Sequence, residues 1–250
     1  MGALLNFFTR RGRSGSALAA PLAQLEQRIG HSFRDPALLE LAFTHTSWVN
    51  DHLGESESNQ RLEFLGDAVL QLVMTEALFQ LFPEAREGQL SKRRAALTKG
   101  AFLAGLAREL SLDTCLRLGA GEEASGGRAR AAALEDAFEA LVGALYVDAG
   151  LPGAARVVLG LYGDLHARLA VENSDNPKGR LQEKIQPTHG NDALRYDVVQ
   201  ASGAAHERSY EVAVFLHDRQ LGLGHGTSKK LAEESAARAA LETLNPDPQP

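Results

Sequence analysis

Four acidic residues stand at helical spacings within two apolar segments of this 250-residue chain. Glu63 and Asp67 are four residues apart, and Asp136 and Glu139 are three apart, so each pair places its carboxylates on one side of a helix. The ordinary explanation for either pair alone is solvated surface charge. No Lys or Arg stands three or four residues from these acids, so ion pairing within a helix does not account for them.

If the two pairs face each other, four carboxylates meet and repel one another unless cations neutralise them. Hard divalent cations prefer oxygen ligands, and Mg²⁺ is the natural candidate, with Mn²⁺ as an alternative. Two such cations support phosphodiester hydrolysis, because they activate a water and stabilise the charge on the attacking and leaving oxygens. The acids therefore indicate metal-dependent phosphodiester cleavage, provided that the two segments lie side by side.

Two expected helices carry the acids. The first, about residues 61–81, is apolar on nearly all sides, which is typical of a central, buried helix. The second, about residues 134–147, has one tight apolar face with Asp136 and Glu139 nearly opposite to it. Both belong to an Ala- and Leu-rich region whose apolar residues follow the helical period.

The style of the sequence changes at residues 173–178 (NSDNPK), a polar stretch that contains a proline. After it we expect, in order, a short helix, three strands and a last helix: 179–186, 194–200, 209–216, 220–224 and 229–244. This order is typical of a small α+β module. The fold expected is therefore multidomain, with an all-α domain over residues 21–170 and an α-β-β-β-α domain over residues 177–245.

Residues 59–70 (NQRLEFLGDAVL) resemble the signature of the bacterial ribonuclease III family. Supporting segments are THTS (44–47), EGQLSKR (87–93), GEEASGGR (121–128) and LEDAFEALVGALYVD (134–148). The resemblance runs in the family's order from about residue 25 to 244. It implies a Mg²⁺-dependent endonuclease that cuts both strands of double-stranded RNA and leaves staggered ends with 5′-phosphates and 3′-hydroxyls. Ribosomal and messenger RNA precursors are the substrates it implies.

By this resemblance, the four acids bind the metal, and Asp67 and Glu139 are the two most directly tied to catalysis. Gln60 stands where the family usually has Glu, and it brings no charge, which puts an accessory contact in question. Glu87 matches a further family acid that assists the placement of RNA or metal. A solvated acid near a helix start explains Glu87 equally well.

Phe64 lies between the acids and either packs into the core or anchors a partner. By the resemblance it inserts into a socket on a second copy of the chain, so a homodimer with one acidic site for each RNA strand is expected. His45, in the THTS segment, is expected to be a structural hydrogen-bonding residue at a helix start rather than a metal ligand.

The last expected helix begins with two lysines, Lys229 and Lys230, after the good N-cap residue Ser228. Lysine there opposes the helix dipole, which favours a docked phosphate, although two solvated lysines are the alternative. Residues 222–241 (GLGHGTSKKLAEESAARAAL) resemble the double-stranded-RNA-binding domain.

The second resemblance implies specific RNA contacts. Gln182 and His206 contact the minor groove, and the two lysines bridge phosphates across the major groove. Residues 177–250 contain nine Lys and Arg against ten Asp and Glu, and the whole chain has a net charge of −6. We therefore expect weak, strongly salt-dependent RNA binding.

Several classes of protein are not favoured. Cys115 is the single cysteine, which excludes an internal disulfide and a cysteine-based zinc site, and no apolar run approaches the ~20 residues of a membrane span. The basic residues of the N-terminal segment follow its apolar patch, the wrong order for a secretion signal. A cytoplasmic protein without a membrane partner or small-molecule cofactor is expected. A non-catalytic RNA-binding protein, favoured only by Gln60, is the main alternative, and a helical dimerisation scaffold would leave the acids unexplained.

Overall fold

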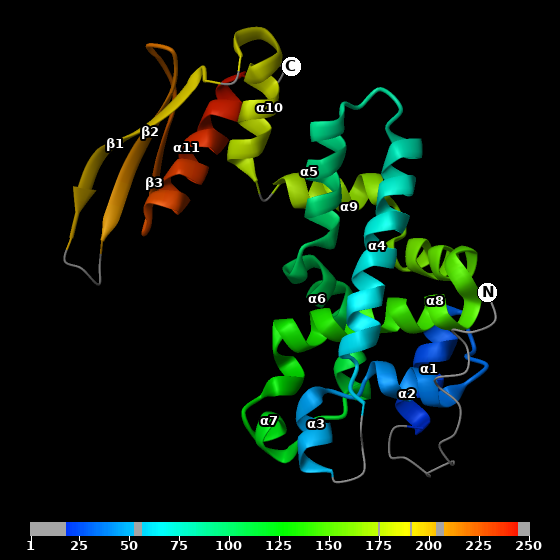
Figure 1. The fold of residues 1–250 in the computed structure, drawn as a ribbon. Helices are drawn as coiled ribbons and strands as arrows, with labels where there is room; N and C mark the ends of the chain where they lie inside the picture. The colour runs from blue at the N-terminus through cyan, green and yellow to red at the C-terminus, as the bar shows by residue number, and fades with distance from the viewer. Residues whose placement is uncertain (1–18, 53–56, 175, 191, 204–207, 245–250) are drawn as a thin grey trace, which may run out of the picture. The chain divides into compact units, whose positions relative to one another are not determined.

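The computed structural model describes residues 19–52, 57–174, 176–190, 192–203 and 208–244 (Figure 1). The chain divides into two compact units, Met1–Leu165 and His166–Pro250. Each unit has buried hydrophobic residues of its own. The multidomain fold expected from the sequence is confirmed.

The first unit is built from helices. In chain order these are α1 (Ala19–Ile29), α2 (Pro36–Ala42), α3 (Thr46–Asp51), α4 (Gln60–Leu81), α5 (Glu87–Thr98), α6 (Gly100–Glu109), η2 (Leu112–Cys115), α7 (Ala120–Ala124), η3 (Gly127–Ala129) and α8 (Ala131–Tyr162). Its extended pairing, within the described residues, is one isolated bridge between Thr44 and Arg117. The all-helical expectation for this part of the chain is confirmed.

Helix α8 consists of two helical parts joined at a kink, and the sequence predicted only the first of them. We expected that helix to end near residue 147. Gly150 does leave the helical conformation, with φ 69°, but the chain turns there and continues helically to Tyr162. Helix α8 is long and apolar enough to cross a membrane by length and composition, yet half of that apolar window is buried inside the structure. Its apolar character therefore has an explanation in the core.

Helices α4 and α8 cross in direct backbone contact at two glycines. A Cβ atom on Gly66 would lie 1.8 Å from the backbone oxygen of Glu139, and one on Gly143 would lie 2.1 Å from the backbone oxygen of Leu62. No side chain larger than hydrogen fits at either position without moving a backbone. This crossing brings the acid-bearing parts of the two helices together.

The expectation that α4 is buried on nearly all sides is wrong in part. Four large apolar side chains on α4 are exposed: Phe64 (83%), Leu72 (51%), Phe79 (69%) and Leu81 (37%). The residues of α4 that are buried, such as Leu70 and Met74, face the core of the unit. Helix α4 thus has a second apolar side that the unit itself does not cover.

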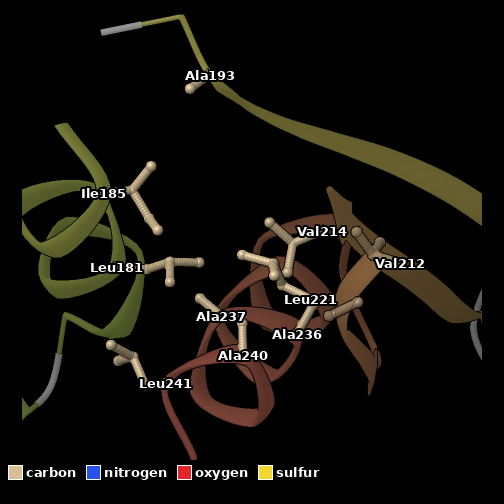
Figure 2. Packing of buried hydrophobic residues seen from close by; sticks show 11 residues of the cluster. Leu181, Ile185, Ala193, Val212, Val214, Leu221, Ala236, Ala237, Ala240 and Leu241 are labelled. Carbon is tan, nitrogen blue, oxygen red and sulfur yellow. The ribbon is translucent and has the colours of Figure 1, made fainter. Parts of the chain in front are cut away.

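The second unit has the expected order of one helix, three strands and one helix, preceded by a further helix. They are α9 (Leu165–Ser174), which starts at the boundary between the units, α10 (Pro177–His189), β1 (Leu194–Ser202), β2 (Ser209–Leu216), β3 (Arg219–Gly226) and α11 (Lys229–Leu244). The strands form an antiparallel sheet in the order β1-β2-β3. Figure 2 shows Leu181 and Ile185 of α10 packed with alanines of α11 and with Val212 and Val214 of β2.

Strand β3 and helix α11 approach each other through small residues. Cβ atoms on Gly222, Gly224 and Gly226 would lie 2.0 to 2.5 Å from backbone atoms of Ala236 or Ala232. Glycine at every second position of the strand faces alanines spaced one helical turn apart. These glycines therefore allow the helix to lie directly on the sheet.

Candidate functional site

The α4–α8 crossing positions all four predicted acids. Gly66 lies between Glu63 and Asp67 on α4 and contacts the backbone of Glu139 on α8. Asp136 is one helical turn before Glu139. Glu63, Asp136 and Glu139 are half-buried, and Asp67 is exposed. The pairs that are separated in the sequence therefore meet where the two backbones touch.

The carboxylates act on one another electrostatically across the two helices. Burial, followed by the charges of Asp67, Glu135, Glu63 and Asp136, raises the pKa of Glu139 to about 8. Burial and then the charge of Asp136 raise the pKa of Glu63 as well. Each predicted acid thus contributes to one shared cluster of carboxylates, as expected if the two acidic pairs face each other.

Asp136 has a basic neighbour that its partners lack. Burial raises the pKa of Asp136, while the charge of His45 opposes this shift. The Nδ1 atom of His45 accepts a hydrogen bond from the backbone N–H of Ser47 at 3.2 Å and so caps the start of α3. The expected structural role of His45 is confirmed, and the residue also favours the charged form of Asp136.

Glu135 is a fifth acid that the sequence analysis missed. It is half-buried, its pKa is raised by burial and by Asp136, and its charge acts on both Glu63 and Glu139. A Cβ atom on Gly100 would lie 2.2 Å from the Glu135 carboxylate, so that carboxylate rests against the first residue of α6. Its position directly before Asp136 and four residues before Glu139 was the available signal.

The carboxylate oxygens of the cluster are suitable ligands for a hard cation. In this structure, however, they do not point toward a common position. Among the described residues, no three His, Cys, Asp or Glu side chains form a ready metal-binding group. The cluster offers carboxylate oxygens that are partly buried and mutually repelling, and a divalent cation would relieve that repulsion. Binding requires the carboxylates to turn toward a common point and Glu139 to release its proton.

Two accessory candidates lie outside the cluster. Gln60 is exposed, and its Oε1 atom accepts a hydrogen bond from the hydroxyl of Ser58 at 3.4 Å. Glu87 is exposed in the first turn of α5, where it accepts a hydrogen bond from Ser91 at 2.8 Å. Neither residue is among the charges that raise the pKa of Glu139. The geometry of Glu87 is that of a solvated acid at a helix start.

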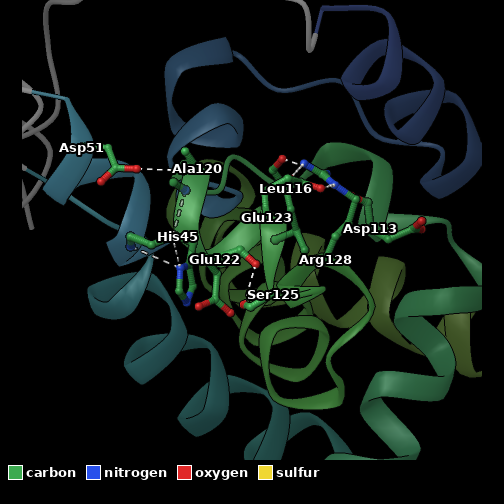
Figure 3. Close-up of polar contacts among 11 residues, drawn as sticks. His45, Asp51, Asp113, Leu116, Ala120, Glu122, Glu123, Ser125 and Arg128 are labelled. Carbon is green, nitrogen blue, oxygen red and sulfur yellow. Dashed lines mark hydrogen bonds and ion pairs between the residues drawn. The ribbon is translucent and has the colours of Figure 1, made fainter.

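The GEEASGGR segment forms hydrogen bonds that hold the chain in place just before α8 begins (Figure 3). The Nη1 atom of Arg128 donates hydrogen bonds to the backbone oxygens of Asp113 and Leu116, at 2.5 and 3.0 Å, and its Nε and Nη2 atoms donate to the two carboxylate oxygens of Glu123. The backbone N–H of Ala120 donates to Asp51 of α3 at 2.7 Å. These contacts hold the start of α8, and with it the acids, in place.

The predicted RNA-binding side chains of the second unit are exposed where the structure describes them. Lys229 and Lys230 lie in the first turn of α11, and Ser228 accepts a hydrogen bond from the Leu231 backbone N–H at 3.2 Å, which confirms the predicted N-cap. Gln182 lies on the exposed side of α10. The predicted contact residue His206 lies outside the described residues.

One of the two lysines has an acidic neighbour. The Nζ atom of Lys230 lies 3.9 Å from Glu234, one turn further along α11. Lys178 of α10 also binds an acid of α11, Glu233, at 2.5 Å. Acids of the module therefore compete with phosphates for part of its positive charge.

Both units match known protein families. Residues 35–164 match a model described as Ribonuclease-III-like, and residues 177–244 match the double-stranded RNA binding motif. The protein called Ribonuclease 3 from Ectopseudomonas mendocina is 46% identical over 227 residues, which cover 89% of this chain and 95% of that protein. The protein of the same name from Streptococcus gordonii is 44% identical over 222 residues, 88% of this chain and 95% of that protein.

A solved structure agrees with these matches. The nuclease domain of ribonuclease III from Campylobacter jejuni, described as flexible in a region involved in dimer formation, is 41% identical with a TM-score of 0.53. The match covers 56% of this chain and 94% of that domain. Fold, motifs and relatives agree over both units, and the chain belongs to the ribonuclease III family.

Proposed function

We propose that this protein is a Mg²⁺-dependent endonuclease that cleaves both strands of double-stranded RNA. The observation that carries the proposal is the meeting of Glu63, Asp67, Asp136 and Glu139 at the α4–α8 crossing, where their charges act on one another. A double-stranded RNA binding motif follows this helical unit in the same chain, which supplies a means of holding the substrate.

The four acids are the proposed metal ligands, and Asp67 and Glu139 are the proposed catalytic acids. A bound divalent cation supplies activation of a water and stabilisation of the charge on the oxygens of the cleaved phosphodiester. The raised pKa of Glu139 keeps its carboxyl protonated near neutral pH without a cation, which reduces the repulsion within the cluster. His45 favours the charged form of Asp136 and so opposes the effect of burial on the pKa of that acid. Gln60 and Glu87 are proposed as accessory residues.

A homodimer completes the proposed enzyme. The exposure of Phe64 excludes the core alternative for this side chain and supports its role as an anchor on a second copy. Two copies present two acidic sites, one for each strand of the duplex, and staggered ends with 5′-phosphates and 3′-hydroxyls are the proposed products. Ribosomal and messenger RNA precursors in the cytoplasm are the proposed substrates. The proposed domain limits are residues 21–170 and 177–245.

Gln182, Lys229 and Lys230, together with His206, are the proposed RNA contacts of the second unit. The nearly equal numbers of basic and acidic residues in residues 177–250, and the acids beside Lys178 and Lys230, support weak, salt-dependent binding.

The test is a cleavage assay on labelled duplex and single-stranded RNA, with Mg²⁺ or with EDTA. We expect cutting of the duplex alone, and only with Mg²⁺. Glu139→Ala should reduce cutting to the EDTA background while RNA binding in EDTA stays near that of the unmodified protein. Glu76→Ala, which removes an exposed acid of α4 away from the cluster, is the matched control and should cut normally.

The same assay tests the main alternative, a non-catalytic RNA-binding protein. Duplex binding without cutting by the unmodified protein would favour the non-catalytic RNA-binding function. Gln60→Glu should change activity only modestly, because the four proposed metal ligands are unchanged.

A further inference from the structure

Gln71 links the exposed acid Asp67 to helix α5. Its Nε2 atom donates to Asp67 Oδ1 at 3.3 Å and to Thr98 Oγ1 at 3.3 Å. A side-chain amide nitrogen carries two hydrogens, so one is available for each acceptor. Both distances are at the long end of the range for hydrogen bonds, and it is the pair of contacts together that orients the amide.

The surrounding hydrogen bonds fix the direction of these contacts. The Thr98 hydroxyl donates to the backbone oxygen of Arg94 at 3.0 Å, which leaves its lone pairs for Gln71. Arg94 donates from Nη1 to the Thr75 hydroxyl at 2.9 Å, and that hydroxyl donates to the Gln71 backbone oxygen at 2.6 Å. Gln71 is therefore held through both its backbone and its side chain by a closed network between α4 and α5.

This network determines how Asp67 is held. Among the described residues, Gln71 is the one side chain that hydrogen-bonds to the Asp67 carboxylate, and it contacts only Oδ1. An ionised carboxylate can only accept hydrogen bonds, so the amide nitrogen rather than its oxygen must face Asp67. The amide is neutral, so it orients the carboxylate without cancelling the negative charge that a cation needs.

We propose that Gln71 is a positioning residue that restricts the orientations of the Asp67 carboxylate and thereby favours its binding of a divalent cation. The inference rests on the proposed function, because it takes Asp67 as a metal ligand. Hydrogen bonds to ligating carboxylates generally matter for affinity, and losing one typically weakens metal binding or activity roughly 10- to 100-fold. The long distances here place the expected loss at the lower end of that range.

The test compares Gln71→Met with Gln80→Met in the full-length protein. Methionine matches glutamine in length but donates no hydrogen bond, and Gln80 is an exposed residue of the same helix. Mn²⁺ binding to the RNA-free protein is measured by electron paramagnetic resonance of the free ion. Gln71→Met should weaken Mn²⁺ binding roughly tenfold and raise the Mg²⁺ concentration for half-maximal cleavage by a similar factor. Gln80→Met should change neither.

Thr98 supplies a graded second test. Thr98→Val removes the hydroxyl that holds the other hydrogen of the Gln71 amide, and it should weaken Mn²⁺ binding by a smaller factor. Thr98→Ser keeps the hydroxyl and should restore normal binding. The KM for duplex RNA and the thermal unfolding temperature should stay the same in Gln71→Met, because a positioning role acts on the metal and not on RNA affinity or on the fold.

Three results would overturn the role of Gln71: normal Mn²⁺ binding in Gln71→Met, an equal loss in Gln80→Met, or no Mn²⁺ binding by the unmodified protein. The proposed function is judged separately. A protein that binds Mn²⁺ through Gln71-dependent ligands but does not cut duplex RNA would support the positioning role and contradict the nuclease.

Discussion

The environment of Glu139 strongly disfavours the charged form of its carboxyl. Its backbone oxygen contacts Gly66, and burial of its side chain, followed by the charges of four other carboxylates, raises its pKa from the ordinary value of 4.5 to about 8. The folded protein therefore holds a proton on Glu139 that the unfolded chain has lost between these two pH values. In this window the free energy of unfolding of the metal-free protein falls as the pH rises, because the native state binds more protons.

We expect Glu139→Gln to flatten this pH dependence. The amide cannot ionise, so the variant should lose about 1 kcal/mol less than the unmodified protein between about pH 6 and about pH 9, a figure reduced because solvent screens a half-buried group. Urea unfolding in EDTA at both pH values measures the difference. Glu76→Gln is the control, and equal pH slopes in all three proteins would contradict the assigned pKa.

Helices α4 and α8 owe their spacing to backbone contact rather than to side-chain packing. Gly66 and Gly143 each face a backbone oxygen of the other helix at a distance that leaves no room for a Cβ atom. Glu63 and Asp67 flank Gly66, and Asp136 and Glu139 precede Gly143 on α8, so the spacing of the helices sets the spacing of the carboxylates.

Gly66→Ala should therefore damage both the fold and the site. Forcing a methyl group against backbone atoms should cost about 3 kcal/mol or more, since neither backbone can relax as a side chain can. Gly105→Ala on α6 is the matched control, because nothing lies within 4 Å of its Cβ position, and it should be neutral or stabilising by up to ~1 kcal/mol. Urea unfolding measures both variants, and equal stability would contradict the close crossing.

The sequence predicted what depends on neighbours in the chain. The acidic pairs and the strands of the second unit depend on local periodicity, and the structure has them close to their expected limits. Contacts between segments that are far apart in the sequence leave no such periodic pattern in it. The Gly66–Glu139 crossing, the Gln71–Thr98 hydrogen bond and the packing of Glu135 against Gly100 each require knowledge of which helices touch. The first part of α8 was predicted to end close to its kink at Gly150, whereas the second helical part, which continues to Tyr162, was not predicted.

At the scale of the whole molecule, the uncovered apolar side of α4 is the main feature that one chain leaves unexplained. Phe64, Leu72 and Phe79 are all more than half exposed on that helix. Burying such side chains is favourable at ~25 cal/mol for each Å² of apolar surface removed from water. A second copy of the chain is the partner that the proposed enzyme requires, and Phe64 lies beside the acids.

We expect Phe64→Asp to weaken the proposed dimer by roughly thirtyfold or more, the effect of losing about 2 kcal/mol from an aromatic anchor. Sedimentation velocity over a range of protein concentrations measures the change. Val199→Asp, which places the same charge at an exposed apolar position of β1, should leave the association unchanged. A dimer of normal affinity in Phe64→Asp would remove Phe64 from the interface.

The glycines of β3 limit which substitutions this strand accepts. Every replacement of glycine adds atoms, and Gly222, Gly224 and Gly226 already place β3 against backbone atoms of α11. Mutation at these positions can therefore only push the helix away from the sheet, never draw it closer. Lys229 and Lys230, at the first turn of that helix, would be displaced with it. A mutation of these glycines would then weaken the RNA contacts proposed for the two lysines.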